Sequence, residues 1–304
     1  MDPADRLYDD LVDFDSVPRG LPLIVALTGY RDAGQVVAQV TQQLLEAEGA
    51  ETIASFDADS LFDFRARRPL ALIEGTRVTA VLHPRLDVRL LRDALGEQFL
   101  FLSGYEPDYR WHSFVDDVVD LVSRLEVSTT TWFHGIPMPV PHTRPIRLSA
   151  TGTRDEVAEA ISVWNPSAEV PAHVLHALEF ELGQREHPVL GLVALVPHYV
   201  ADAPVPGAAL AVIEGLATAT GIQLETADLL DSEREWRDEV DGQVSANPEV
   251  QRLIAALEAQ HDAYLAGLHR DGGLVDADGS LPSADEIAAE IERYLATKPD
   301  PDGQ

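Results

Sequence analysis

Apolar residues recur along this chain in two patterns, and the first is the short unbroken run. Such runs, bounded by Gly, Pro or polar turn residues, are typical of buried β-strands. The clearest cover residues 22–28 and 189–196. Further strand candidates are residues 52–56, 70–73, 77–82, 98–102 and 129–133. The stretch ALIEGTRVTAV also predicts a hairpin with its turn at Glu74-Gly75.

In the second pattern, apolar residues stand three and four positions apart, as on one face of a helix. This spacing covers residues 33–49, 109–125, 172–182 and 206–220. Strands therefore alternate with helices over most of the chain. That order predicts an α/β fold, a three-layer open sheet that is mainly parallel and has helices on both faces.

After about Asp228 the sequence becomes strongly charged and helix-forming. We expect two helices that pack back on the α/β body, then the acidic linker DGGLVDADGS and a short last helix. Ser283 and Glu286 have the spacing of a capping box for that last helix. The predicted domains are an α/β domain over residues 1–228 and a helical C-terminal extension, with its acidic linker and tail, over residues 229–304.

Composition narrows the classes of function. A formal net charge of −30 disfavours nucleic acid and anionic membranes as partners, because both bind positive surfaces. The chain has no cysteine, which excludes disulfides, thiolate metal ligands and thiol nucleophiles. The N-terminal stretch MDPADRLYDD lacks the features of a signal peptide, and no apolar run is long enough to span a bilayer. We therefore expect a soluble, cytoplasmic protein.

The pattern Gly29-x-x-x-x-Gly34, between a predicted strand and a predicted helix, is the first half of a phosphate-binding loop. The second half is missing, because Gln35 and Val36 follow where such a loop has Lys and Ser or Thr. The only lysine of the chain is Lys298. Asp32 is placed to cap the helix, with Gln35 completing a capping box, and its carboxylate would repel phosphate. We predict a tight strand-to-helix turn and no cofactor.

Two segments concentrate the residues that carry chemistry. FDADSLFDFRARRPL brings acidic and basic side chains close together, either as a surface ion-pair network or as a cleft where arginines clamp an anion. HGIPMPVPHTRPIR carries histidines and arginines on an extended, proline-rich segment, either for acid-base or ligand duty or as a rigid arm that pairs with another subunit. The candidate ligand-binding residues are Asp57, Asp59, Arg65, Arg68, His134, His142, Arg144 and His198.

His173, His176 and Glu179 follow each other at three-residue steps on a predicted helix. This stripe lacks the spacing of HExxH, so we expect no metal site. The chain also has no Gly-x-Ser-x-Gly elbow and no GxGxxG fingerprint, so no residue is predicted to be catalytic.

Four segments together resemble a known family: LIVALTGYRDAGQVVAQ, FDADSLFDFRARRP, FHGIPMPVPHTRP and LVALVPHYVADAP. They are similar to the proteasome assembly chaperone 2 (PAC2) family, in its actinobacterial branch. The resemblance covers most of residues 7–265. It implies an open α/β sheet like that of nucleoside phosphorylases and peptidyl-tRNA hydrolases. It also implies homo- or hetero-oligomers, since eukaryotic members are scaffolds on which proteasome α-subunits assemble.

Two further properties of the family have weaker support in this sequence. Family chaperones can grip the proteasome α-ring with a C-terminal hydrophobic-Tyr-any tripeptide, whereas this chain ends PDPDGQ and its nearest tyrosine is Tyr294. The family has also been predicted to contain ATP-dependent ligases, which use lysines that this chain lacks. The expected function is a non-enzymatic, homo-oligomeric scaffold or assembly-chaperone-like protein. The alternative is a small-molecule-binding protein or hydrolase, with the Asp, Arg and His candidates in a cleft at the carboxyl ends of the strands.

Overall fold

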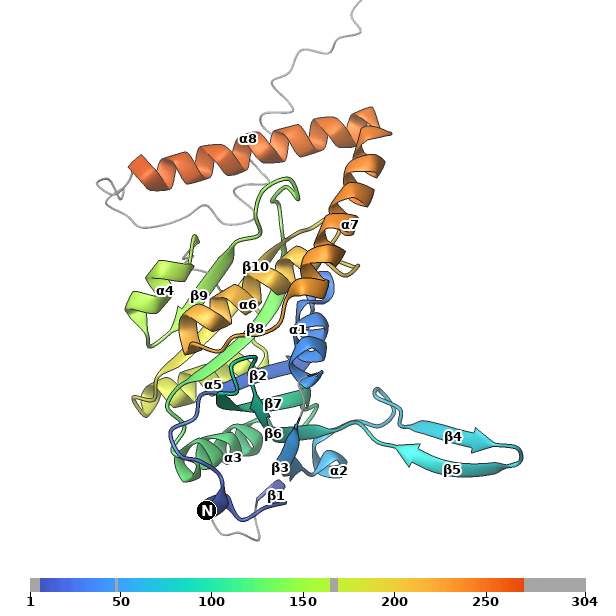
Figure 1. The fold of residues 1–304 in the computed structure, drawn as a ribbon, viewed down its shortest axis with the longest axis vertical. Coiled ribbons are helices and arrows are strands. Elements are labelled where there is room, and N and C mark those ends of the chain that lie inside the picture. The colour runs from blue at the N-terminus through green and yellow to red at the C-terminus, as the bar shows by residue number, and fades with distance from the viewer. Residues whose placement is uncertain (1–5, 47–48, 165–168, 271–304) are drawn as a thin grey trace, which may run out of the picture.

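The computed structural model describes residues 6–46, 49–164 and 169–270, and its core is one large mixed sheet (Figure 1). The order of the eight strands is β1-β3-β6-β7-β2-β8-β10-β9. Their bounds are β1 Tyr8–Asp10, β2 Leu23–Thr28, β3 Glu51–Phe56, β6 Leu86–Arg92, β7 Gln98–Tyr105, β8 Thr130–Met138, β9 Leu148–Gly152 and β10 Val189–Pro197. The four central strands β7, β2, β8 and β10 are parallel, and antiparallel strands complete both ends.

Helices cover both faces of the sheet, as the alternating pattern predicts. The helices are α1 Val36–Leu45, α2 Ala58–Leu61, α3 Trp111–Arg124, α4 Asp155–Ile161, α5 Val174–Gln184 and α6 Pro206–Thr220, with short 3-10 turns η2 Phe14–Ser16 and η3 Ala33–Gln35. Along β2, Leu23, Val25 and Leu27 join the core cluster with α3 and α5. Ile24 and Ala26 join the cluster with α1 and α6 on the other face. A strand buried on both faces explains why residues 22–28 form an unbroken apolar run.

The strands that the sequence did not predict are the antiparallel strands β1, β6 and β9, and β1 is only three residues long. Residues 86–92 form β6 and residues 148–152 form β9, and both contain charged or polar residues that blur the apolar pattern. Asp87 on β6 is fully buried and accepts hydrogen bonds from Arg89 and Ser55. The proline-rich segment was expected to be extended, and its first part is extended as the end of β8.

The Gly29 to Gly34 segment forms a strand-to-helix turn. Gly34 has φ of 69°, and a Cβ there would meet Val196 and Val205 at 3.1 Å. Gln35 has a left-handed backbone and makes no capping box. Asp32 instead accepts hydrogen bonds from the backbone N–H groups of Val37 and Ala38 in α1, at 2.9 and 3.2 Å. The turn is thus closed by a carboxylate, as expected, although by a different geometry.

Two long helices follow the sheet, α7 Ala227–Ser245 and α8 Pro248–Arg270. α7 leaves the body beside α6, and α8 crosses above the loop between β8 and β9 (Figure 1). The predicted last helix with Ser283 and Glu286 lies outside the described residues, and the division at residue 228 stays a prediction. Within the described ranges, no helix combines the length and apolar character needed to cross a membrane.

The predicted hairpin is confirmed, although its turn is Gly75-Thr76 and not Glu74-Gly75, and it stands apart from the body. β4 Leu70–Glu74 pairs with β5 Arg77–Leu82 as a separate two-stranded sheet. It projects sideways into solvent (Figure 1). Large apolar side chains on it are 46–68% exposed, namely Leu70, Leu72, Ile73, Val78, Val81 and Leu82.

Candidate functional site

The candidate site begins where two central parallel strands separate. β2 pairs with β8 only as far as Val25 and Trp132, and beyond that point β8 pairs with β10 alone. Pro137 therefore sits on a strand edge where no N–H is required. Gly135 lets the 3-10 turn η3 approach β8, because a Cβ there would lie 2.3 Å from the Ala33 carbonyl oxygen. Open α/β sheets bind ligands where neighbouring strands diverge in this way.

Three histidines and two other aromatic residues meet beside this gap. His134 on β8 has its ring centroid 4.9 Å from that of His173, and His173 is 4.0 Å from His176. Trp132 stacks on His134 at 5.7 Å and lies edge-on to the other two rings. Tyr30, from the turn after β2, lies 5.2 Å from His173. We call His134, His173 and His176 the histidine cluster.

The start of α5 fixes two of these rings. His173 is the N-cap, and its Nδ1 accepts a hydrogen bond from the Leu175 N–H at 3.2 Å. His176 Nδ1 accepts one from the His173 N–H at 3.3 Å. A neutral imidazole that accepts at Nδ1 carries its proton on Nε2, so both rings present Nε2–H as a donor. Glu106, from the loop after β7, accepts a hydrogen bond from the Val174 N–H at 2.7 Å and holds the same helix end.

The histidine cluster is buried and partly unpaired. His134 is 7% exposed and His173 is 3% exposed. Nδ1 of His134 and Nε2 of His173 have no hydrogen-bond partner among the described residues. Unpaired buried polar atoms are rare in native proteins and costly, so each needs an explanation.

Burial makes these imidazoles neutral. Burial first, and then the neighbouring His176, lower the pKa of His134 to about 4, against a smaller opposing influence of backbone groups at Gly135 and Arg31. Burial and the two neighbouring histidines lower the pKa of His173 to about 2, and burial lowers the pKa of His176. All three rings are therefore uncharged at neutral pH.

A carboxylate lies one turn further along α5. Glu179 Oε2 accepts hydrogen bonds from Trp132 Nε1 at 2.8 Å and from the Thr151 hydroxyl at 3.0 Å. Burial raises the pKa of Glu179, and these two hydrogen bonds act in the opposite direction. Gly191 on β10 makes room for this contact, because a Cβ there would lie 2.3 Å from the Trp132 ring.

The histidine cluster borders an open pocket of about 500 Å³, which we call the histidine pocket. His134, His176 and Tyr30 form one end of it. The sheet supplies its floor through Ile136, Ser149, Thr151 and Val193, while α4 and the segment after it contribute Asp155, Glu159, Trp164, Val170 and Pro171. This size is in the range of small-molecule sites. No three His, Asp or Glu side chains in the described ranges are arranged to hold a metal ion.

The other two candidates in the proline-rich segment fasten the C-terminal helices. His142 Nδ1 lies 2.7 Å from the Tyr199 hydroxyl, and its Nε2 lies 3.0 Å from Asp241 on α7. Arg144 pairs with Glu258 at 3.1 Å and with Asp262 at 2.7 Å, both on α8. We call these contacts the clasp. The Arg144 guanidinium lowers the pKa of Asp262 to about 2.

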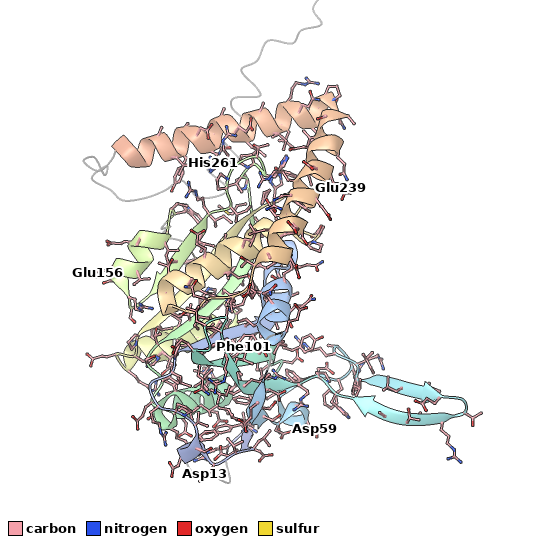
Figure 2. The ribbon with its side chains drawn as sticks, in the orientation of Figure 1. Asp13, Asp59, Phe101, Glu156, Glu239 and His261 are labelled. Atoms are coloured by element: carbon pink, nitrogen blue, oxygen red, sulfur yellow. The ribbon has the colours of Figure 1, made fainter. Side chains whose placement is uncertain are left out.

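The remaining candidates lie elsewhere. Asp57 caps α2 by accepting from the Asp59 N–H at 3.0 Å, and Asp59 is exposed on that helix (Figure 2). Arg65 and Arg68 are exposed on the following loop, and His198 is exposed with Nδ1 3.3 Å from the Met138 carbonyl oxygen. Of the eight candidates, only His134 lines the histidine pocket. The other seven candidates lie outside this pocket, and a ligand-binding role for them stays a prediction.

Sequence reasoning found the stripe of His173, His176 and Glu179 but did not connect it with His134. The sequence does contain both parts of the cluster. His134 follows a predicted strand, and His173 and His176 lie at the start of a predicted helix. Tyr30 carried no signal of its own.

A model of the PAC2 family matches residues 26–244 of the chain. A protein of unknown function from Corynebacterium glutamicum superimposes with a TM-score of 0.80 at 35% identity, covering 86% of this chain and 98% of that one. One of unknown function from Mycobacterium tuberculosis gives 0.79 at 35%, covering 88% and 92%. A proteasome-assembly chaperone homologue from Mycobacterium tuberculosis gives 0.70 at 21%, covering 77% and 100%.

A comparison with curated proteins finds no match to this chain. The family match spans well over half of the sequence, and the segments that suggested the resemblance fall within or overlap the matched range. The chain therefore belongs to the PAC2 family, in its actinobacterial branch.

Proposed function

We propose that the protein is an oligomeric scaffold of the assembly-chaperone type, and that the hairpin β4–β5 is its contact arm. The observation that carries this proposal is the exposure of the hairpin. Ile73 and Val78 are register partners and are 67% and 61% exposed. An isolated two-stranded hairpin is marginally stable in water, and its unpaired edges can bind another chain. Exposed apolar surface of this kind marks a protein contact.

The lack of net charge on the hairpin permits a second copy of this chain as the occupant. The chain as a whole carries a net charge of −30, so two copies repel each other. The hairpin, residues 70–82, contains one acidic and one basic residue, Glu74 and Arg77. The hairpin is therefore an apolar arm without net charge on an acidic body. Contact through it adds little electrostatic repulsion between two copies.

The scaffold role is supported by the family and by the contents of the structure. The mycobacterial proteasome-assembly chaperone homologue shares this fold. The Ser149 hydroxyl in the lining of the histidine pocket donates to the Trp164 carbonyl oxygen and makes no hydrogen bond to His134 in the described residues, so the two do not form a serine-histidine pair there. Assembly with a proteasome α-ring is one partner class for such a scaffold, and co-purification with 20S particles tests it.

Light scattering after size exclusion tests the contact arm. The wild-type chain is expected to run as an oligomer at micromolar concentration, and the double variant Ile73→Asp/Val78→Asp is expected to run as a monomer. Leu95→Asp is the matched control, because Leu95 is 74% exposed but lies outside the hairpin. A monomeric wild type, or an oligomer that survives the hairpin variant, contradicts the proposal.

A second candidate function is small-molecule binding in the histidine pocket. The size and lining of the pocket support it, because a volume of about 500 Å³ with both apolar and polar lining residues, such as Ile136, Val193 and His176, is typical of small-molecule sites. A compound library screened by thermal shift against wild type and Ala158→Trp tests it, since Ala158 lines the pocket and Trp would fill it. Hits that persist in Ala158→Trp, or no hits, count against this function.

A further inference from the structure

We infer that the histidine pocket takes a small organic cation with several N–H donors, such as an aliphatic diamine or polyamine. This inference rests on the second candidate function and names its ligand class. It is carried by three features of the pocket: the sign of its charges, the direction of its hydroxyl hydrogen bonds, and its aromatic end wall.

The charged residues that line the pocket are all acidic. Asp155 and Glu159 stand one turn apart on α4, and both are exposed. Neither carboxylate makes a hydrogen bond or ion pair with any other residue that the structure describes. The neighbouring Arg154 is turned away, because it donates to the Ala219 carbonyl oxygen at 2.6 Å. A ligand in this pocket therefore meets two unpaired negative charges and no positive one from the lining residues.

The hydroxyl groups of the pocket donate their hydrogen bonds to other groups of the chain. Ser149 donates to the Trp164 carbonyl oxygen at 2.6 Å, and Thr151 donates to Glu179 at 3.0 Å. The Tyr30 hydroxyl donates to the Pro171 carbonyl oxygen at 3.4 Å. Each oxygen keeps lone pairs that can accept. Apart from the Nε2–H of His176, the polar side chains of the pocket thus offer mainly acceptors, which fits a ligand that is rich in donors.

The end wall suits a cation as well. Tyr30, His134 and Trp164 line the pocket with aromatic rings, whose faces attract positive charge. His134 is 7% exposed and uncharged, so its ring adds no positive charge to the lining of the pocket. An anion would meet neutral imidazoles and two carboxylates here, so the same features disfavour carboxylate or phosphate ligands.

Three probes of equal chain length test the class: 1,4-diaminobutane, 1,4-butanediol and succinate, titrated by calorimetry at about 150 mM salt, where exposed charges are screened. The variant Asp155→Asn/Glu159→Gln removes the two carboxylates from the pocket. The matched control Glu156→Gln/Asp202→Asn removes the same two charges from exposed positions outside the pocket; Glu156 lies on the same helix (Figure 2). All four positions are exposed, so both variants should fold.

The expected result is binding of the diamine alone, weakened at least tenfold in the pocket variant and within twofold of wild type in the control. Equal weakening in both variants would mean attraction to a diffuse acidic surface and would overturn the inference. Binding of the diol or succinate, abolished by Ala158→Trp, would overturn the cation class while leaving small-molecule binding intact. Absence of binding by all three probes would also overturn the cation class, and the library screen then decides separately whether the pocket binds any ligand.

Discussion

Two buried histidines from the same part of the chain differ in how they are paired. His142, after β8, has Tyr199 on one ring nitrogen and Asp241 on the other. His134, on β8, has an unpaired Nδ1 and two further imidazoles against its ring. Both were predicted as ligand residues from the sequence. The ring with both nitrogens paired is part of the clasp that holds α7, and the ring with one unpaired nitrogen borders a pocket.

This difference shows how a buried polar residue that stabilises the fold can be told from one at a functional site. A ring whose nitrogens are both bonded stabilises the fold, and removing it leaves its partners unsatisfied. A ring left unpaired costs stability, and natural sequences keep such costs mainly at functional sites. The comparison predicts different responses of the two histidines to substitution, and it predicts that His134 contributes to the pH dependence of stability.

The largest expected effect is on the pH dependence of stability. The pKa of His134 is about 4 in the folded chain, below the ordinary value of 6.5. As pH falls from 6.5 toward 4, the unfolded chain takes up a proton that the folded chain refuses, so stability is lost. His134→Leu should remove about 1.4 kcal/mol per pH unit of that loss, on the order of 3 kcal/mol in all.

Urea titrations of wild type and His134→Leu at several pH values measure this slope. His198→Leu, which removes an exposed histidine, is the control for the histidine-to-leucine substitution itself. The raised pKa of Glu179 acts in the opposite direction, favouring the folded state as pH falls, but it is common to all three proteins and cancels in the difference. Parallel curves for wild type and His134→Leu would mean that His134 titrates normally.

The next effect concerns the paired ring. His142→Leu should lower the free energy of unfolding at pH 7 by about 2–3 kcal/mol, because Tyr199 and Asp241 lose their partner inside the clasp. Chemical denaturation followed by circular dichroism measures it. A loss below about 0.5 kcal/mol, the size of an ordinary surface substitution, would show that the clasp contributes nothing.

A smaller effect is expected from one atom of the clasp. Tyr199→Phe removes the hydroxyl that bonds the ring and the backbone N–H of His142 but leaves the aromatic contact. The free energy of unfolding should fall by about 1 kcal/mol. In a double-mutant cycle with His142→Leu, the two losses should not add, since both remove the same hydrogen bond. Additive losses would place Tyr199 outside the clasp.

The smallest expected effect is the one that separates the two rings most clearly. At pH 7, His134→Leu should change the free energy of unfolding by less than about 0.5 kcal/mol or increase it, because an unpaired polar group is replaced by an apolar one. The same denaturation measurement checks it beside His142→Leu. A loss as large as that of His142→Leu would mean that the fold depends on both rings equally.

The sequence predicted most of the fold because the residues that the core buries form unbroken apolar runs or recur at helical spacing. β2, β10, α3 and α6 lie close to their predicted bounds, since each places apolar residues on faces that the core covers. β6 and β9 were missed because Asp87 and Ser149 are buried polar residues with partners outside their own strands, Ser55 on β3 for Asp87 and the Trp164 carbonyl oxygen for Ser149. No local pattern records a partner of that kind.

The candidate site was predicted only in part, for the same reason. His134 was named, but its neighbours His173 and His176 come from the start of α5 and were grouped as a helical stripe. Their meeting depends on the point where β2 and β8 separate, which is a property of the folded sheet. Asp57 and Asp59 were predicted as ligand residues, but their spacing is explained locally. Asp57 is the N-cap of α2, and Asp59 lies in its first turn.

The position of the hairpin β4–β5 in the chain has a consequence for the evolution of this protein. β3 and β6 pair directly, with Ser55 opposite Asp87, and the hairpin lies within the connection between them. Because both strands hold their register without it, the segment can be lengthened, shortened or exchanged while the sheet survives. A change of the proposed contact arm therefore leaves the pairing of β3 with β6, and the core built on it, in place.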